Sequence, residues 1–499
     1  MFKLKFNAGN KKISYKPDSV SVKYFIDNKK LEADLKQFER VSGIKLSSLQ
    51  KKTFLSDKGN EIRISKPGGK PDEFAIVKVK IDENLSADFF RNHLAGFIQK
   101  ISTEEIKNLH ISIPKYSEFK SLFDSEEYFY QSFVEGLNLG NYSFDKYKKS
   151  KEKPSELNVS FYADSQKKIN STLAKTKSVM EGVNFTKDLQ NEPGIAVTPA
   201  ELARRIQNKF RRTKVRVRVF NEKEIKKRKM GGLLAVGMGS ANPPRFIILE
   251  YKGSKKSKTF SLVGKGVTFD AGGISIKPAS NMGEMKADMS GAAVVAGTLL
   301  AAAKAKLPVN ILGVIPSAEN MVSGSAMRPG DIVVTSSGKS IEVDNTDAEG
   351  RMILADALHF ASQRKPNVII DLATLTGACV VALGEYAAGL FTKNDKLAEQ
   401  LYTSGIKTHD RVWRLPMWDD YNELIKSDVA DVNNVGKTRW GGAITAAKFL
   451  EHFVDKKITW AHLDIAGPAM ANDLNNYTRK YMTGFGVRLL FDYLSGKAN

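Results

Sequence analysis

The order of hydrophobic and polar positions predicts the fold class of this chain. Apolar runs with the length and composition of buried strands lie at residues 246–249, 260–263, 309–315 and 367–372. Runs with apolar residues at helical spacing lie at residues 291–305, 351–362 and 443–454. Strands that alternate with helices are typical of an α/β domain with a central, mostly parallel or mixed sheet flanked by helices. Catalytic groups in such a domain are expected at the strand ends and in the loops that follow them.

The first 165 residues have a different pattern and predict a separate domain. Alternating runs at residues 20–24 and 77–81 indicate strands, and residues 88–98 form an amphipathic helical pattern. Residues 145–158 are rich in Lys, Ser and Glu and are expected to form a linker or an exposed loop. We therefore expect two domains, a smaller N-terminal α/β domain over residues 1–165 and a larger α/β domain over residues 166–499.

Two helices are expected where the second domain begins. Helical spacing of apolar residues predicts the first from about residue 165 to residue 189. Thr198 and Glu201 enclose Pro199 in the pattern of a capping box, which predicts a second helix over residues 199–210.

Composition narrows the class of protein. Hydrophobic residues make up 42% of the 499, which suffices for sizeable cores. No apolar run reaches the roughly eighteen residues of a membrane span, and residues 1–7 lack the apolar core of a signal peptide, so a cytoplasmic protein is expected. The single cysteine, Cys379, excludes an intramolecular disulfide and any thiolate-rich metal site.

The net charge of +22 raises the hypothesis of nucleic-acid binding. The positive charge is spread along the chain roughly in proportion to length, apart from a basic cluster at residues 204–229. Within it, residues 214–220 alternate and predict a strand with one solvated basic face, although the cluster could still hold an acidic surface. No recognisable DNA-binding motif is present, so DNA binding stays open only as an addition to catalysis.

A pair of closely spaced acids suggests a bound cation. Asp347 and Glu349 stand two residues apart and would point to the same side of an extended segment. Acids this close repel each other unless a metal ion or an arginine lies between them. Further candidates lie upstream in Gly-rich stretches that are poor in other charges: Lys265, Asp270, Lys277 and Asp288.

The chemistry of these side chains favours a metal centre over other sites. Carboxylates suit Mg²⁺, Mn²⁺ or Zn²⁺, and four of them can hold two divalent ions. Lysine ligates only as a neutral amine, so Lys265 and Lys277 need separate roles, one as a ligand and one as a cation. Lys265-Gly266 lacks the spacing of a P-loop, and the chain contains no HExxH, HxxEH or GxSxG motif.

At these residues the chain closely resembles the leucyl aminopeptidase (cytosol aminopeptidase) family. The family signature NTDAEGR stands at residues 345–351. The Lys265, Asp270, Lys277 and Asp288 series also fits, as do residues 244–251, 371–378, 441–443 and 460–468. The similarity extends from about residue 185 to the end of the chain.

The resemblance implies a two-metal aminopeptidase that releases N-terminal amino acids, preferably leucine-like ones, from peptides with a free N-terminus. One metal ion would be held by Lys265, Asp270, Asp288 and Glu349, and the other by Asp270, Glu349 and both the side chain and the carbonyl of Asp347. Zn²⁺ or Mn²⁺ is expected, with Mg²⁺ or Co²⁺ as alternatives. A water or hydroxide that bridges the two ions would attack the peptide carbonyl.

The resemblance also implies roles for residues around the metals. Lys277 would polarise the scissile carbonyl, and Arg351 would hold a bicarbonate that shuttles the proton. The pocket for the first side chain would be formed by Met285, Thr374, Gly377 and Ala466, and the backbone at Leu375 and Gly377 would bind the peptide.

Two further expectations follow from the family. Members assemble as homohexamers, and some bacterial members also bind DNA. Some relatives place methionine where Ala469 stands, so this position bears on the preference for the first side chain. An inactive structural homologue is disfavoured because every ligand of a two-metal site is present.

Overall fold

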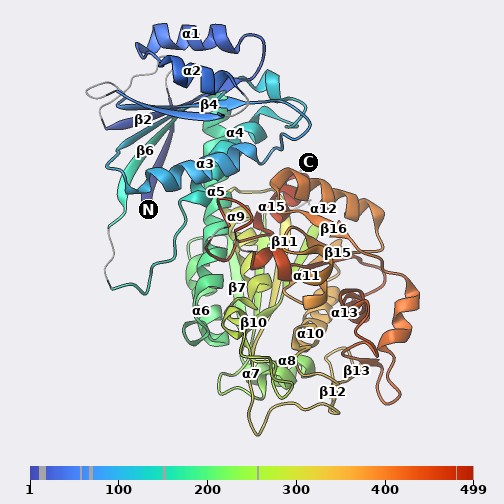
Figure 1. The fold of residues 1–499 in the computed structure, drawn as a ribbon. Coiled ribbons are helices and arrows are strands. Elements are labelled where there is room, and N and C mark those ends of the chain that lie inside the picture. The colour runs from blue at the N-terminus through green and yellow to red at the C-terminus, as the bar shows by residue number, and fades with distance from the viewer. Residues whose placement is uncertain are drawn as a thin grey trace. The chain divides into compact units, whose positions relative to one another are not determined.

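The fold is described by a computed structural model over residues 1–9, 18–56, 59–66, 71–149, 153–254, 258–471, 473–478 and 480–497. The chain divides into two compact units, Met1–Lys177 and Ser178–Asn499, each with its own sheet (Figure 1). Within the described ranges, no helix combines the length and the apolar character needed to cross a membrane.

The N-terminal unit is built on a six-stranded sheet of order β1-β6-β5-β2-β4-β3. All its pairings are parallel except that of β3 with β4. The strands are β1 Phe2–Ala8, β2 Ser19–Ile26, β3 Glu61–Ser65, β4 Glu73–Val79, β5 Asn108–Ser112 and β6 Ser155–Tyr162. The helices are α1 Leu31–Ser42, α2 Ser48–Leu55, α3 Phe89–Lys100, α4 Glu126–Gly140 and the first part of α5 Gln166–Asn191, with short 3-10 turns η1 Ile101–Thr103 and η2 Tyr116–Phe119.

Two apolar cores hold this unit together. One is rich in phenylalanine and joins the sheet to α3 and α4, with Phe90 and Phe133 stacked at 4.4 Å between ring centroids. The other joins the sheet to α1 and α2 around Phe38, Phe54 and Phe74. The strands predicted at residues 20–24 and 77–81 and the helix predicted at residues 88–98 are confirmed by β2, β4 and α3.

The loop predicted over residues 145–158 is wrong in its last part. Residues 150–152 lie outside the described residues, but β6 begins at Ser155 and pairs with β1 and β5. Its alternate residues Leu157, Val159 and Phe161 are buried, and this alternation outweighs the polar composition that indicated a loop.

The C-terminal unit is built on a nine-stranded mixed sheet of order β16-β15-β18-β14-β9-β11-β8-β7, with β10 paired to β11 outside this path. Its four central strands, β18, β14, β9 and β11, are mutually parallel, so that Ile370 of β14 lies opposite Leu262 of β9 and Ala461 of β18. The strands are β7 Val215–Phe220, β8 Arg245–Lys252, β9 Thr259–Gly264, β10 Gly266–Asp270, β11 Asn310–Asn320, β14 Val368–Ala373, β15 Ala388–Phe391, β16 Val412–Arg414 and β18 Thr459–Asp464.

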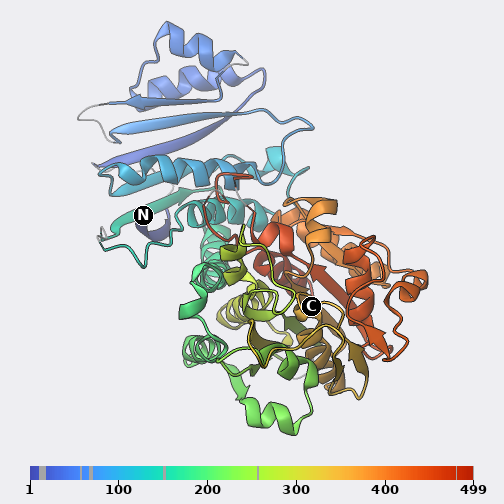
Figure 2. The same cartoon turned by 60° about the horizontal axis from the view of Figure 1, so that its bottom comes forward.

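Helices lie on both sides of this sheet (Figures 1 and 2). Helix α9 contacts three central strands and α15, and α10 contacts the same strands together with α8 and α13. The helices are α6 Pro199–Phe210, α7 Glu222–Lys227, α8 Gly231–Gly237, α9 Ser290–Lys304, α10 Glu349–Gln363, α11 Gly377–Leu383, α12 Asp395–Thr408, α13 Gly442–Glu451, α14 Ala466–Ala469 and α15 Val487–Ser495, with 3-10 turns η3 Gly194–Ala196, η4 Met282–Ala287 and η5 Asp419–Ile425.

These elements confirm the strands and helices predicted for this part of the chain. Thr198 caps α6 by accepting a hydrogen bond from the Glu201 N–H, as its sequence pattern predicts. A small third sheet consists of β12 Ile332–Val334, β13 Ser340–Glu342 and β17 Val432–Asn433, and β13 is followed by the turn that carries Asp347 and by the start of α10 at Glu349. Because the central strands are parallel, their carboxyl ends and the following loops meet at one edge of the sheet.

Candidate metal centre

The predicted metal ligands converge at this edge. Lys265 directly follows β9, Asp270 ends β10, Glu349 is the first residue of α10, and Asp288 lies between η4 and α9. Carboxylate oxygens of Asp270, Asp347 and Glu349 all lie within 4.8 Å of one another. The structure therefore brings together side chains that are up to 84 positions apart in the sequence, from Lys265 to Glu349.

The local conformation of residues 345–349 differs from the prediction of an extended segment. Asp347 lies in a turn closed by the Asn345 side chain, whose Oδ1 accepts a hydrogen bond from the Asp347 N–H at 2.8 Å. Glu349 already belongs to α10. Asp347 and Glu349 therefore lie close together because a turn leads directly into α10, and not because alternate residues of a strand face the same side.

Two lysines lie between the acids. The Lys265 Nζ is 2.8 Å from both Asp288 Oδ2 and Glu349 Oε1. The Lys277 Nζ is 3.0 Å from Asp270 Oδ2 and 2.5 Å from Asp347 Oδ1. Each ammonium thus occupies a position between two carboxylates, where a divalent ion would also be attracted.

Two glycines allow this close approach. A Cβ on Gly350 would lie 2.6 Å from Lys265 Cε, so a larger residue at the start of α10 would displace the Lys265 side chain. Gly272 has φ +87°, a conformation that favours glycine, and lets the chain fold back after Asp270 toward Lys277.

The buried oxygens at the centre fit a set of metal ligands. Apart from the lysine contacts, Asp288 Oδ2, Asp347 Oδ1 and Glu349 Oε1 have no hydrogen-bond partner among the described residues. Buried carboxylate oxygens are costly unless a cation or a donor faces them. Oxygen donors with one lysine amine form a ligand set suited to divalent metal ions.

The pKa shifts of the charged groups at the centre also fit a set of metal ligands. Burial, together with repulsion from Asp270, raises the pKa of Glu349 and of Asp347 above their usual values. Burial acts to lower the pKa of Lys265, but the carboxylates around it outweigh burial and hold that pKa above its usual value. Lys265 must lose its proton to bind a metal ion, so loading the centre would release protons.

Arg351 lies one helical residue beyond Gly350 and is buried. Its Nη1 donates a hydrogen bond to the Asn434 carbonyl at 2.7 Å, and its Nε has no hydrogen-bond partner among the described residues. Burial lowers the pKa of Arg351 to about 10 against the opposing effect of Glu349. The guanidinium therefore stays charged at neutral pH and keeps one buried N–H donor without a partner among the described residues.

The predicted substrate residues lie in the segments that follow β14 and β18, including the first residues of α11 and α14, and in η4. Thr374 donates a hydrogen bond to Asp288 Oδ1 at 2.8 Å, so it holds a predicted metal ligand in place. Gly377 begins α11 and is exposed, while Ala466 begins α14, and these two short helices contact each other. Met285 lies in η4, where its carbonyl accepts a hydrogen bond from the Asp288 N–H. Ala469 is fully buried in α14.

Two further residues support the centre and were not singled out by the sequence. Asn320, at the end of β11, donates hydrogen bonds to Asp270 Oδ1 at 2.8 Å and to the Thr346 carbonyl at 3.1 Å. Asp464, at the end of β18, accepts hydrogen bonds from the Leu375 N–H and from the Thr376 hydroxyl. Each is a polar residue at the end of an apolar strand, and this is the sequence signal that could have identified it.

Comparisons with known proteins show to which family the chain is similar. The model of the cytosol aminopeptidase family, catalytic domain, matches residues 184–491, and the model of that family's N-terminal domain matches residues 21–151. The chain is 43% identical over 493 residues to a probable cytosol aminopeptidase of Chlorobium phaeobacteroides, which covers 93% of this chain and 97% of that protein. It is 41% identical over 495 residues to a probable cytosol aminopeptidase of Aquifex aeolicus, with 96% of each covered.

Two solved structures are similar over nearly their whole length. A mutant of tomato leucine aminopeptidase is 31% identical, with a TM-score of 0.85 over 99% of this chain and 97% of that one. The bottromycin maturation enzyme BotP in complex with Mn is also 31% identical, with a TM-score of 0.82 over 97% of this chain and 100% of that one.

Proposed function

The chain belongs to the cytosol aminopeptidase family and is a metallo-aminopeptidase, and we propose that it releases leucine-like residues from the N-termini of peptides. The observation that carries the proposal is the meeting of Asp270, Asp347 and Glu349 oxygens within 4.8 Å, with Lys265 and Lys277 between the acids.

The residues of the centre would hold two divalent metal ions. One ion would bind Lys265, Asp270, Asp288 and Glu349, and the other Asp270, Asp347 and Glu349. Zn²⁺ or Mn²⁺ fits this donor set, with Mg²⁺ and Co²⁺ as alternatives. When bound, the two ions would supply the nucleophile, a bridging water with a lowered pKa.

The exposure of the two lysines supports their separate roles. The Lys265 side chain is 4% exposed and lies between two predicted ligands, which suits a ligand. The Lys277 side chain is 22% exposed, so its ammonium is open to a substrate. Lys277 would donate a hydrogen bond to the oxygen of the scissile carbonyl and stabilise the negative charge that develops there.

Arg351 and the loops around the centre would complete the reaction. The planar guanidinium of Arg351 suits a bicarbonate, which would accept and return the proton during hydrolysis. Met285, Thr374, Gly377 and Ala466 would form the pocket for the first side chain. The Leu375 N–H is held by Asp464, which leaves the Leu375 carbonyl for the peptide.

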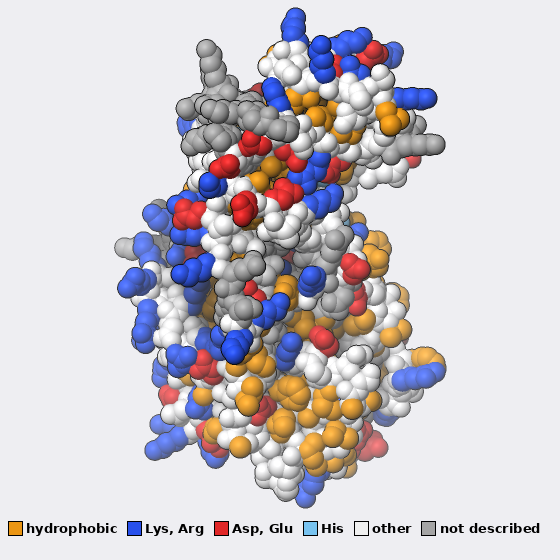
Figure 3. Space-filling model, turned by 60° about the vertical axis from the view of Figure 1, so that its left-hand side comes forward, with side chains coloured by type: hydrophobic (Ala, Val, Ile, Leu, Met, Phe, Trp, Pro, Cys, Tyr) orange, Lys and Arg blue, Asp and Glu red, His pale blue; other side chains and the backbone are white. Residues whose placement is uncertain are grey.

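The proposal also includes the oligomeric state of the protein and its cellular compartment. A homohexamer in the cytoplasm is expected from the family, and several large apolar side chains are exposed for such contacts, among them Val381, Trp418 and Trp440. Light scattering should give the mass of six chains, and a monomer would contradict this part. DNA binding is not favoured, since Figure 3 shows basic side chains mixed with acidic and apolar ones over one face.

Hydrolysis of a leucine chromogenic amide tests the proposal. The protein is stripped of metal, supplied again with Mn²⁺ or Zn²⁺, and assayed beside the N-acetylated form of the same amide. We expect metal-dependent cleavage of the free-amine substrate alone. Cleavage of the acetylated amide at the same rate would rule out an aminopeptidase, and faster cleavage of an alanine or arginine amide would overturn the leucine preference.

A further inference from the structure

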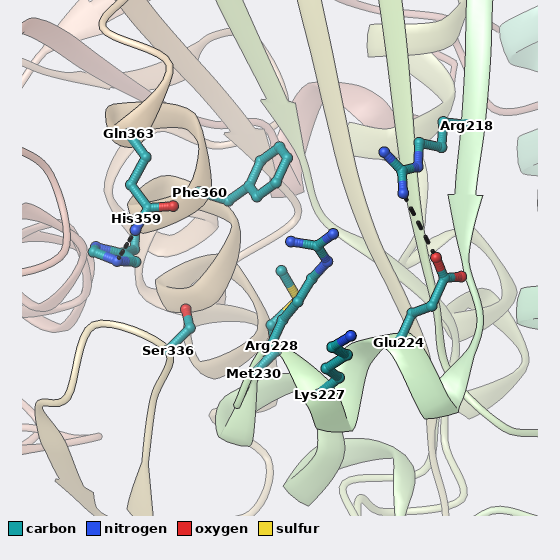
Figure 4. A pocket seen from close by; sticks show the side chains of 9 residues that line it. All are labelled: Arg218, Glu224, Lys227, Arg228, Met230, Ser336, His359, Phe360 and Gln363. Carbon is teal, nitrogen blue, oxygen red and sulfur yellow. Dashed lines mark hydrogen bonds and ion pairs between the residues drawn. The ribbon is translucent and has the colours of Figure 1, made fainter.

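The C-terminal unit has a pocket lined by residues that do not belong to the metal centre (Figure 4). It is a half-open pocket of about 450 Å³, lined by residues of β7, of α7 and the residues that follow it, of the turn between β12 and β13, and of the C-terminal part of α10. Helix α10 begins at Glu349 in the metal centre and carries His359 and Phe360 at the pocket. At 1.5 Å per residue, ten to fourteen helical residues separate the two sites by about 15 to 20 Å.

The pocket carries an excess of positive charge. Arg218, Lys227 and Arg228 line it, with Glu224 as the acid among the lining residues (Figure 4). Glu224 lies 3.8 Å from Arg218 and also accepts a hydrogen bond from the Asn221 N–H at the start of α7. Among the described residues, no ion pair joins Lys227 or Arg228 to an acid. About two positive charges therefore remain without compensation.

Both arginines of the pocket lie over one aromatic ring, that of Phe220. The Arg228 guanidinium lies 4.1 Å from the centroid of Phe220, and the Arg218 guanidinium lies 4.8 Å from the same ring. Phe220 is buried and stacks on Phe246, and Phe360 meets Phe246 edge to face at 5.1 Å. Guanidinium groups that already lie over a buried ring have less freedom to lose when they bind a ligand.

Interaction with the negative, C-terminal end of α7 explains only part of why these cations lie at the pocket. Lys227 and Arg228 stand at the end of α7, where a cation complements the carbonyl ends of a helix, but α7 has only six residues. The pocket also has a polar wall, because His359 Nε2 lies 2.9 Å from the Gln363 side-chain nitrogen and Ser336 lies on the same side of the pocket (Figure 4). A basic pocket of this volume has the size of a small-molecule site.

We propose that this pocket binds the phosphate group of a small phosphorylated molecule. A phosphate monoester carries close to two negative charges at neutral pH, which matches the uncompensated charge of the pocket. Arg218 and Arg228 offer planar forks for its oxygens, and Lys227 adds a third cation. His359 and Gln363 offer hydrogen bonds to the rest of the molecule.

Calorimetric titration of the metal-loaded protein with inorganic phosphate tests the proposal. We expect saturable binding at one site per chain. Lys227→Ala/Arg228→Ala should weaken it at least tenfold, and the charge-matched pair Lys223→Ala/Lys226→Ala on the same helix should change it less than twofold. Gln363→Trp keeps every charge but fills the mouth of the pocket, and it should also abolish binding. All the substituted residues are exposed, and circular dichroism would verify the fold.

Several outcomes would overturn the proposal. Equal weakening by both lysine pairs would mean that phosphate senses only the general surface charge. Binding that none of the variants changes would place phosphate at the metal centre. A third outcome would mark the region as a nucleic-acid surface instead. The protein would not bind phosphate, but it would bind duplex DNA. Both double variants would weaken DNA binding, and Gln363→Trp would leave it unchanged.

Discussion

The surroundings of Lys277 suit the proposed role in transition-state stabilisation better than the role of a metal ligand. Its ammonium contacts Asp270 and Asp347 but remains partly exposed, whereas Lys265 is enclosed by Asp288 and Glu349. Burial acts to lower the pKa of Lys277, but Asp270 and Asp347 outweigh burial and hold the pKa above its usual value. A permanent positive charge at this place can stabilise an oxyanion without taking part in metal binding.

Lys277→Ala should therefore lower kcat by roughly 10²- to 10³-fold, because it removes an interaction that strengthens in the transition state. Its metal content should stay that of the wild type, as measured by elemental mass spectrometry. Lys396→Ala, an exposed lysine on α12, serves as the control. A variant at position 277 with unchanged kcat would remove Lys277 from the mechanism.

At the scale of elements, α10 carries much of the site. Its first turn presents Glu349 and Arg351, and Gly350 between them leaves room for the Lys265 side chain. Alanine normally favours a helix over glycine by about 1 kcal/mol. At position 350 the same methyl group would meet Lys265 Cε at 2.6 Å.

Gly350→Ala should thus leave the helix intact but move Lys265, and we expect at least a tenfold loss of kcat/KM together with weaker metal retention. Equilibrium dialysis against a chelator and steady-state kinetics would measure both effects. Gly324→Ala is a suitable control, since a Cβ there meets no atom within 4 Å. Wild-type activity in the Gly350 variant would show that Lys265 does not need its present position.

At the scale of the whole molecule, the centre connects metal binding to the stability of one unit. A ligand that binds only the folded state stabilises it by about 2.7 kcal/mol at one hundred times its Kd. All the predicted metal ligands belong to the unit Ser178–Asn499. Metal should raise the melting temperature of this unit and leave a separate transition of the N-terminal unit unchanged.

Differential scanning calorimetry of metal-stripped and Mn²⁺-loaded protein measures this difference. Because two-unit chains can unfold in separate steps, the two transitions are assigned by proteolysis at each temperature. A melting temperature that is independent of metal would mean that the acids do not bind metal in the folded state.

The sequence predicts the central strands and helices of the C-terminal unit and the residues that gather at the metal centre. It does not predict the local conformation that brings these residues together. Apolar periodicity was sufficient for β9, β14, α9 and α10, because buried elements carry the clearest patterns. It failed for β6, where polar neighbours hid the alternation of Leu157, Val159 and Phe161. It also gave the wrong conformation for Asp347, because the Asp347 N–H donates a hydrogen bond to Asn345 Oδ1 and closes a turn there.

The supporting residues carry a local signal, a polar residue at the end of an apolar strand, but that signal does not say which strand ends meet. Asn320 and Asp464 are ordinary polar residues until the strand order places their ends beside Asp270 and Leu375. That order is decided by long-range pairing and not by local pattern. The basic pocket likewise depends on β7, α7 and α10 meeting in space.

The central claim is that Asp270, Asp347 and Glu349 hold the metal ions on which peptide cleavage depends. The most direct test measures metal content and leucine-amide hydrolysis on the same preparations of wild type and Asp270→Ala. We expect two divalent ions per wild-type chain, activity that follows their loading, and loss of both metal and activity in the variant. An Asp270→Ala protein that retains two ions and wild-type turnover would contradict the claim.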